Sequence, residues 1–219
     1  MNLEQLLLKA IKTSVKGGQA ILKIYESDFD VDYKEDNSPL TIADKKCNQI
    51  IESDLALTSI PILSEEGKHT HFDERKKWEY LWLVDPLDGT KEFVKKNGEF
   101  TVNISLIKNG KPIIGVVFVP VSGVIYFGMK GLGSFKCNYE NNSNADFSYF
   151  LNQSKKLPII NNRDNFIIVG SRSHMSAETE KYFLLMKEKH KKVEVLSVGS
   201  SLKLCMVAEG KADVYPRYA

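Results

Sequence analysis

Residues 80–93 constrain the fold more than any other part of the sequence. They open with an apolar run, 80–84, which is long enough for a buried strand and too short for a buried helix. Asp85-Pro86 follows, and we expect the strand to stop there because proline donates no hydrogen bond to a sheet. Asp88-Gly89-Thr90 then predicts a turn and a helix start, in which Thr90 caps the following amides.

Two carboxylates, Asp85 and Asp88, are therefore expected at the carboxyl end of a buried strand and beside a helix N-terminus. Such a pair suits Mg²⁺ and a phosphate, because hard cations take oxygen ligands and a helix N-terminus presents N–H groups to an anion. A tight turn rich in turn-forming residues is the alternative. The spacing excludes phosphatases of the haloacid dehalogenase type, whose two aspartates have one residue between them instead of two.

Composition is that of an ordinary globular protein. The 219 residues can bury a full core, and the formal charge of +2 does not favour a nucleic-acid or membrane-surface partner. Apolar runs are of strand length, and the first residues lack the features of a signal peptide. Cys47, Cys137 and Cys205 are widely separated, as is typical of reduced thiols. We expect a cytoplasmic protein without transmembrane segments, with peripheral attachment to the inner membrane as the alternative.

Hydrophobic periodicity predicts alternating helices and strands. A helix over residues 3–25 precedes a second one that starts after Thr41, where Thr41 and Asp44 resemble a capping box. A short strand, 60–63, leads into Ser64-Glu65-Glu66, and Asn109-Gly110 predicts a hairpin between two strands. Further strands are expected at residues 100–107, 112–119, 123–129, 166–169, 193–198 and 212–215, and further helices at 176–192 and 199–208.

These elements fall into two blocks. We expect an N-terminal α+β subdomain over residues 1–137, which carries the metal and phosphate site, and a C-terminal α/β subdomain over residues 166–219. Residues 138–165 are rich in Asn, Ser, Asp and Lys and predict a connecting or edge region. Because the chain ends directly after an expected strand, we expect the C-terminal block to be truncated.

Several separate motifs resemble the inositol monophosphatase superfamily of Mg²⁺-dependent, lithium-sensitive phosphatases. Ser64-Glu65-Glu66 and residues 82–93 carry this resemblance. Within the superfamily, the 3′(2′),5′-bisphosphate nucleotidases of the CysQ type are similar in residues 97–104, 170–174, 197–203 and 215–217. The resemblance covers nearly the whole chain, and it implies a layered α/β (α+β) sandwich of the inositol monophosphatase and sugar phosphatase type.

The resemblance also implies a cation site with two or three Mg²⁺ ions. Glu65, Asp85 and the backbone carbonyl of Leu87 would hold one ion, and Asp85 and Asp88 a second. Two such ions would flank an in-line displacement at phosphorus. The family carries a Trp-Asp motif shortly after residues 215–217, whose aspartate completes the second site. This ligand is absent from the chain, so we expect weaker binding of the second Mg²⁺.

Catalytic and substrate-binding roles follow from the same resemblance. Asp44 and Thr90 would position and deprotonate the attacking water, while Glu65 and the amides of Gly89 and Thr90 would face the scissile phosphate. Four further residues would bind the nucleotide: His174, Ser200, Lys203 and Arg217. Local sequence alone would instead make Asp44 a helix cap, Ser200 an N-cap, and the two cations ordinary surface charges.

The resemblance thus implies a phosphatase that hydrolyses the 3′-phosphate of adenosine 3′,5′-bisphosphate to AMP and phosphate, in sulfate assimilation and nucleotide recycling. A small nucleotide bisphosphate is the expected ligand, and Lys203 and Arg217 could neutralise its second phosphate. Two alternatives remain. One is an inositol or sugar monophosphatase, and the other is an inactive, truncated form that only binds nucleotide or metal.

Overall fold

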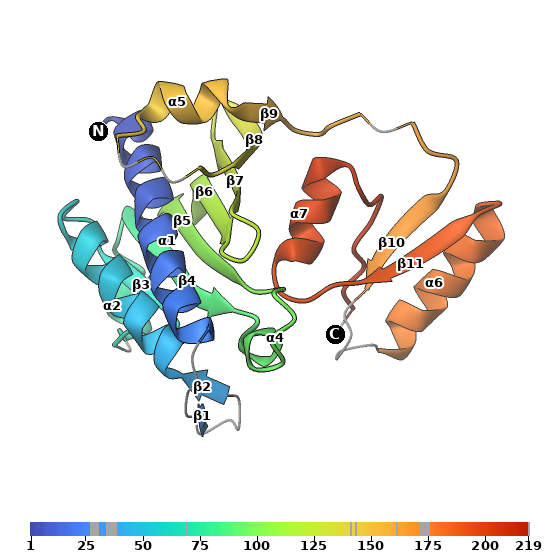
Figure 1. Cartoon of the computed structure of the whole chain (residues 1–219), viewed down its shortest axis with the longest axis horizontal. Coiled ribbons are helices and arrows are strands. Elements are labelled where there is room, and N and C mark those ends of the chain that lie inside the picture. The colour runs from blue at the N-terminus through green and yellow to red at the C-terminus, as the bar shows by residue number, and fades with distance from the viewer. Residues whose placement is uncertain are drawn as a thin grey trace.

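The structure is a computed structural model that describes residues 1–26, 31–33, 39–68, 70–140, 142, 144–160, 162–170 and 176–218. Its elements form successive layers, which Figure 1 shows from one side of the molecule to the other. Helices α1 (Leu3–Tyr25) and α2 (Ile42–Ala56) cover one face of a seven-stranded sheet. Helix α7 (Leu202–Glu209) lies on the other side of it, followed by a two-stranded sheet and helix α6 (Ala177–Lys189). The expected layered α/β sandwich is confirmed.

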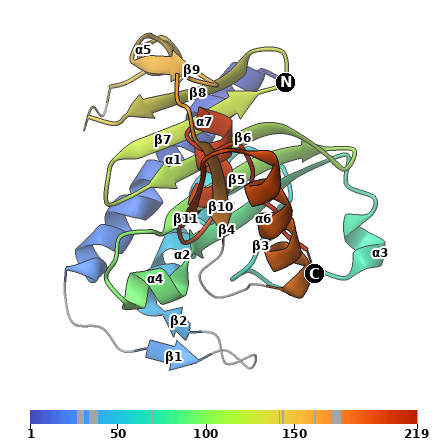
Figure 2. The same ribbon diagram turned by 90° about the vertical axis from the view of Figure 1, so that its right-hand side faces the viewer.

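The seven-stranded sheet has the strand order β3-β4-β5-β6-β7-β8-β9, which can be followed in Figure 2. Only the β3–β4 pair is parallel. Asn109 and Gly110 both have positive φ, 48° and 73°, and join β5 to β6, so the predicted hairpin is confirmed. The strands are β3 (Ile62–Ser64), β4 (Tyr80–Asp88), β5 (Thr101–Lys108), β6 (Lys111–Val119), β7 (Val124–Met129), β8 (Gly133–Asn138) and β9 (Ser154–Lys156).

Smaller elements surround this sheet. A short antiparallel pair, β1 (Val31–Tyr33) and β2 (Pro39–Thr41), precedes α2. The helices α3 (Phe72–Arg75) and α4 (Thr90–Val94) flank β4 along the chain. Residues 138–165 contain α5 (Phe147–Asn152) and the edge strand β9, so this segment contributes to the sheet as well as connecting the two blocks.

The main core lies between α1, α2 and the large sheet. Gly17 permits the close approach of the two helices, because a Cβ atom at this position would lie 2.6 Å from the Cys47 Sγ atom. An aromatic cluster at one end of this core joins Tyr25, Phe93 and Phe100, with ring centroids 5.1 to 5.2 Å apart. Because Phe93 belongs to α4, this cluster anchors the short helix that follows the Asp88-Gly89 turn.

The second sheet consists of two parallel strands, β10 (Phe166–Gly170) and β11 (Val193–Ser197), which α6 connects. The expected helix over 176–192 ends earlier, at Lys189. The expected strand at 212–215 is wrong: its only β pairing among the described residues is a single bridge between Val214 and Ile168. One bridge cannot form a ladder, and α7 followed by the Gly210 turn leaves this segment only a short run beside β10.

Candidate active site

The proposed site is built on the end of β4. This strand does not stop at Asp85-Pro86, as we expected, but continues to Asp88. Its register against β5 shifts between Asp85 and Asp88, and this irregularity contains Pro86. A proline is tolerated at such a point because the ladder needs no N–H there. The bulge therefore changes the direction of the chain between the two carboxylates.

A tight turn follows the bulge. Gly89 is the N-cap of α4 and has a φ of 95°, which side-chain-bearing residues rarely adopt. The predicted cap by Thr90 is wrong, because Thr90 is already the first helical residue and its hydroxyl donates back to the Leu87 carbonyl oxygen at 3.3 Å. A Cβ atom on Gly89 would lie 3.0 Å from the Glu99 carbonyl oxygen, so the turn also packs closely against the start of β5.

Three acidic residues influence one another at this end of the sheet. Glu65 follows β3, and its N–H donates to the Val84 carbonyl oxygen at 3.1 Å, which ties it to β4. Burial, followed by the charges of Asp88 and Glu65, raises the pKa of Asp85 to about 7. Burial also raises the pKa of Asp88, although the Ser201 N–H and the Lys203 charge oppose the shift. Glu65, Asp85 and Asp88 thus lie near enough for their charges to act on one another.

These carboxylates suit a divalent cation in both chemistry and charge. The Oδ1 atom of Asp85 is buried and has no hydrogen-bond partner within the described part of the chain. A cation would supply that partner and would relieve the mutual repulsion that raises the pKa of Asp85. Among the described residues, no three or more Asp, Glu, His or Cys side chains form a complete metal-binding cluster.

Asp44 lies in the first turn of α2 and is 3% exposed. After burial, the charges of Asp44 and Asp85 are the next causes that raise the pKa of the Cys47 thiol. Both carboxylates therefore lie near enough to this one thiol group for their charges to act on it.

The second block contributes Lys203, which is only 8% exposed. The alternative of an ordinary surface charge is therefore wrong for this residue. Its Nζ atom donates to the carbonyl oxygens of Val198 and Ser200, at 3.2 and 2.6 Å. Burial lowers the pKa of Lys203, while the nearby charge of Asp88 opposes the shift. The Lys203 side chain is thus held by the loop before α7, and its positive charge acts on the acidic site.

The other expected nucleotide-binding residues lie in different settings. Ser200 has a φ of 50° and its hydroxyl accepts from the Leu202 N–H at 3.3 Å, whereas the N-cap of α7 is Ser201. Arg217 is exposed, and its charge contributes to the lowered pKa of Lys203. His174 lies outside the described residues, so its predicted role stays a prediction.

Three residues with no role predicted from the sequence, Thr101, Asn103 and Ser201, also belong to the site. The Ser201 N–H donates to Asp88 Oδ2, and the Ser201 hydroxyl lies 3.0 Å from Asn103 Oδ1 and 2.8 Å from the Thr101 hydroxyl. The alternation of side chains along β5 places Thr101 and Asn103 on one face of the strand. This alternation, together with the position of β5 after the acidic turn, is the sequence signal from which the place of Thr101 and Asn103 in the site could have been predicted.

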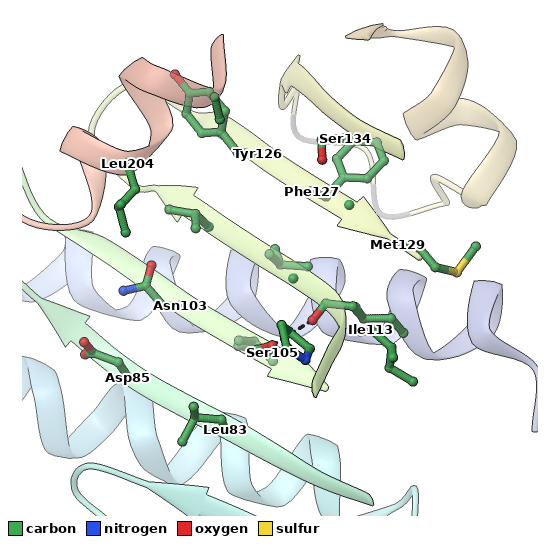
Figure 3. Close-up of a pocket in the computed structure, with 18 of the residues that line it drawn as sticks. Leu83, Asp85, Asn103, Ser105, Ile113, Tyr126, Phe127, Met129, Ser134 and Leu204 are labelled. Atoms are coloured by element: carbon green, nitrogen blue, oxygen red, sulfur yellow. Dashed lines mark hydrogen bonds between the residues drawn. The ribbon is translucent and has the colours of Figure 1, made fainter. Parts of the chain in front are cut away.

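A cavity of about 1080 Å³ extends from the acidic site across the large sheet. Figure 3 shows Asp85 on β4 and Asn103 on β5 at one end, with Leu204 of α7 above them. Most of the remaining lining is apolar and comes from β6 and β7 and includes Ile113, Phe127 and Met129. Polar side chains such as Arg75, Lys130 and Ser134 also line the cavity, and its acidic side chains are Glu65 and Asp85.

A sequence profile of the Inositol monophosphatase family matches residues 2–219. This chain belongs to the inositol monophosphatase family. Enzymes of this family are metal-dependent. The acidic turn described above lies inside the matched region, as do Lys203 and the described part of the second block.

Relatives of this family member include the 3′(2′),5′-bisphosphate nucleotidase CysQ of Shigella flexneri, which is 42% identical over 206 residues, or 92% of this chain and 76% of the relative. CysQ of Buchnera aphidicola is 42% identical over 218 residues, or 98% of this chain and 76% of the relative. The crystal structure of CysQ from Bacteroides thetaiotaomicron has a TM-score of 0.89 at 48% identity, and covers 100% of this chain and 82% of that one.

No helix within the described ranges is both long and apolar enough to cross a membrane.

Proposed function

We propose that this family member is a CysQ-type 3′(2′),5′-bisphosphate nucleotidase, which hydrolyses the 3′-phosphate of adenosine 3′,5′-bisphosphate to AMP and phosphate. The identity of 42% to relatives with this name, over 92% and 98% of the chain, supports the proposal. The observation that carries it is the mutual charge effect of Glu65, Asp85 and Asp88, to which the buried Lys203 of the second block adds its charge at Asp88.

Three groups would hold the first cation in this proposal. They are the carboxylates of Glu65 and Asp85 and the carbonyl oxygen of Leu87. Mg²⁺ is the proposed ion, since every one of these ligands is an oxygen. When bound, it would lower the pKa of the attacking water and stabilise charge on the leaving oxygen. A second ion held by Asp85 and Asp88 belongs to the same proposal.

The residues of the chain would orient the reactants and accept the proton. The Thr90 hydroxyl already donates to Leu87, so its lone pairs are left to accept a hydrogen bond from the attacking water. Asp44 is the group we propose as the acceptor of the water proton, with its carboxylate buried near the site. The amides of Gly89 and Thr90 would hold the oxygens of the scissile phosphate.

Specificity for a nucleotide bisphosphate would reside in the second block. A substrate with a second phosphate needs cationic donors away from the acidic site. We assign Lys203 and Arg217 to this task, together with Ser200 and His174. The exposure of Arg217 leaves its guanidinium group accessible to a ligand, and the buried Lys203 would fix the position of the bound phosphate.

The test is a competition assay with the whole chain and Mg²⁺. Phosphate release from adenosine 3′,5′-bisphosphate and from inositol 1-phosphate is measured separately and in mixtures, with and without lithium. We expect preferential hydrolysis of the nucleotide and inhibition by lithium. Preference for inositol 1-phosphate would contradict the assigned specificity. Tight binding of the nucleotide by calorimetry without any hydrolysis would favour a binding protein instead.

A further inference from the structure

A chain of polar side chains connects the start of α7 to the two aspartates. The hydroxyl oxygens of Thr101 and Ser201 lie 2.8 Å apart, and the Ser201 hydroxyl lies 3.0 Å from Asn103 Oδ1. Asn103 in turn lies directly opposite Asp85 in the β4–β5 ladder, and its side-chain amide, as a hydrogen-bond donor, opposes the rise in the pKa of both Asp85 and Asp88. Thr101 is fully buried, so solvent cannot substitute for its neighbour. Figure 3 shows Asn103 and Asp85 on adjacent strands, at the same end of the cavity.

Elementary hydrogen-bond chemistry gives this chain a direction. The Oδ1 atom of Asn103 carries no hydrogen, so the Ser201 hydroxyl must donate to it. A hydroxyl has one hydrogen, and Ser201 must therefore accept the hydrogen bond from Thr101. With Oδ1 engaged in this way, the two hydrogens of the Asn103 amide are left for the carboxylates of Asp85 and Asp88, which accept when ionised.

The opposite orientation of the amide would place the Asn103 oxygen against two ionised carboxylates, which only accept hydrogen bonds. The two carboxylates therefore select the orientation in which the NH₂ group faces them. The Ser201 hydroxyl holds the amide in place at the far end by donating to its Oδ1 atom. Ser201 also contacts the site a second time, through the hydrogen bond from its backbone N–H to Asp88.

We propose that Ser201 and Thr101 are positioning residues of the cation site, which hold the Asn103 amide as a double donor to Asp85 and Asp88. Groups of this kind orient metal ligands, and their loss typically lowers metal affinity by about 10–100-fold. Because Ser201 is the N-cap of α7, this chain of hydrogen bonds also couples the carboxylates to the helix that carries Lys203. The inference rests on the proposed function, since it requires a cation between these aspartates.

The experiment measures Mg²⁺ binding to the whole chain by calorimetry, in the absence of substrate. We expect Ser201→Ala to weaken Mg²⁺ binding by about 10-fold. Ser201→Thr retains a hydroxyl and should restore most of the affinity. The matched control is Ser105→Ala on β5, the strand that carries Asn103, because the Ser105 hydroxyl donates to the Ile114 carbonyl oxygen at 2.8 Å, away from the aspartates. This control should bind Mg²⁺ within about twofold of the starting chain.

Thr101→Val provides the second variant, since it removes only the Thr101 hydroxyl, which lies at the end of the hydrogen-bond chain farthest from the aspartates. If Thr101 acts through Ser201, the double variant Thr101→Val/Ser201→Ala should bind Mg²⁺ no more weakly than Ser201→Ala alone. Kinetics give an independent readout. The Mg²⁺ concentration for half-maximal rate should rise for both single variants, whereas KM for the nucleotide at saturating Mg²⁺ should change less than about threefold.

The outcomes separate this inference from the proposed function. If the starting chain does not bind Mg²⁺, the proposed cation site is wrong and the inference fails with it. If it binds Mg²⁺ and folded Ser201→Ala binds equally well, the positioning role alone is wrong. Additive losses in the double variant would also overturn the directed chain. If Ser201→Ala fails to fold, Thr101→Val decides, and unchanged Mg²⁺ affinity in that variant contradicts the inference.

Discussion

Replacing Asp85 by asparagine should stabilise the metal-free chain at pH 8, although it removes a proposed ligand. Asp85 lies at the bulge of β4, where one of its oxygens is buried without a hydrogen-bond partner among the described residues. Its negative charge also lies near those of Asp88 and Glu65. A neutral amide of nearly the same shape removes this repulsion and much of the cost of burial.

The magnitude follows from the pKa of Asp85. Burial and its acidic neighbours raise this pKa to about 7, whereas an aspartate in an unfolded chain has a pKa of about 3.9. The protonated form therefore stabilises the fold fully below the unfolded pKa, and this contribution is lost as the pH rises through the folded one. The full difference corresponds to about 4 kcal/mol in the free energy of unfolding.

Asparagine recovers only part of this free energy, because Asn103 and the backbone at Leu87 donate hydrogen bonds that favour the charged carboxylate. We expect a gain of about 2 kcal/mol at pH 8, or about 4–8 °C in Tm. The gain should shrink towards pH 5, where the native Asp85 is protonated. Added Mg²⁺ should raise Tm of the starting chain but not that of the variant.

Thermal unfolding in the presence of a chelator, at pH 5 and pH 8, measures this effect. Asp164→Asn is the matched control, because it makes the same chemical change at an exposed carboxylate, and its Tm should not change. Equal stability of Asp85→Asn and the starting chain at pH 8, or the same gain at both pH values, would refute the electrostatic reasoning.

Three further predictions concern the turn, the attachment of α7 and the second block. Gly89→Ala should lower the free energy of unfolding by about 1–3 kcal/mol in urea titrations, because of its φ of 95° and the carbonyl oxygen of Glu99 at 3.0 Å. Glu209→Gln should cost about 3 kcal/mol, because buried Glu209 accepts from Lys136 at 2.6 Å. Burial alone would raise the pKa of Glu209, but its hydrogen bonds outweigh burial, and the net pKa is lowered. The ionised Glu209 therefore stabilises the fold at a pH above the pKa of the unfolded chain. In acid titrations this contribution should fade as the pH falls through the lower pKa of the folded chain. Lys203→Met should raise KM for the nucleotide by about 10-fold or more in steady-state assays, with a smaller change in kcat.

Features determined by neighbouring residues could be predicted from the sequence. Asn109-Gly110 specifies its hairpin locally, because both residues tolerate positive φ. The order of strand, acidic turn and short helix at β4 and α4 also follows from nearby residues. The resemblance then assigned chemistry to Glu65, which no local pattern would separate from a solvated turn.

Features that depend on distant contacts could not be predicted. The continuation of β4 past Pro86 requires pairing with β5, which no local rule anticipates. The hydrogen bond from Ser201 to Asp88 joins residues 113 positions apart. Lys203 occupies a first-turn position that would be exposed on an isolated helix, and it is buried near Asp88 and the Tyr215 ring, both distant from it in the sequence. Long-range packing thus determines how the two blocks meet at the acidic site.

The reaction of adenosine 3′,5′-bisphosphate can be followed by ³¹P NMR, with the whole chain and Mg²⁺, to show which of the two phosphates is removed. We predict loss of the 3′-phosphate resonance, retention of the 5′-phosphate resonance, and growth of inorganic phosphate. The reaction should stop when a chelator is added and should be absent for Asp88→Asn. Loss of the 5′-phosphate, turnover that persists without a divalent cation, or no turnover of a folded, Mg²⁺-bound chain would mean that the protein is not a Mg²⁺-dependent 3′-phosphatase.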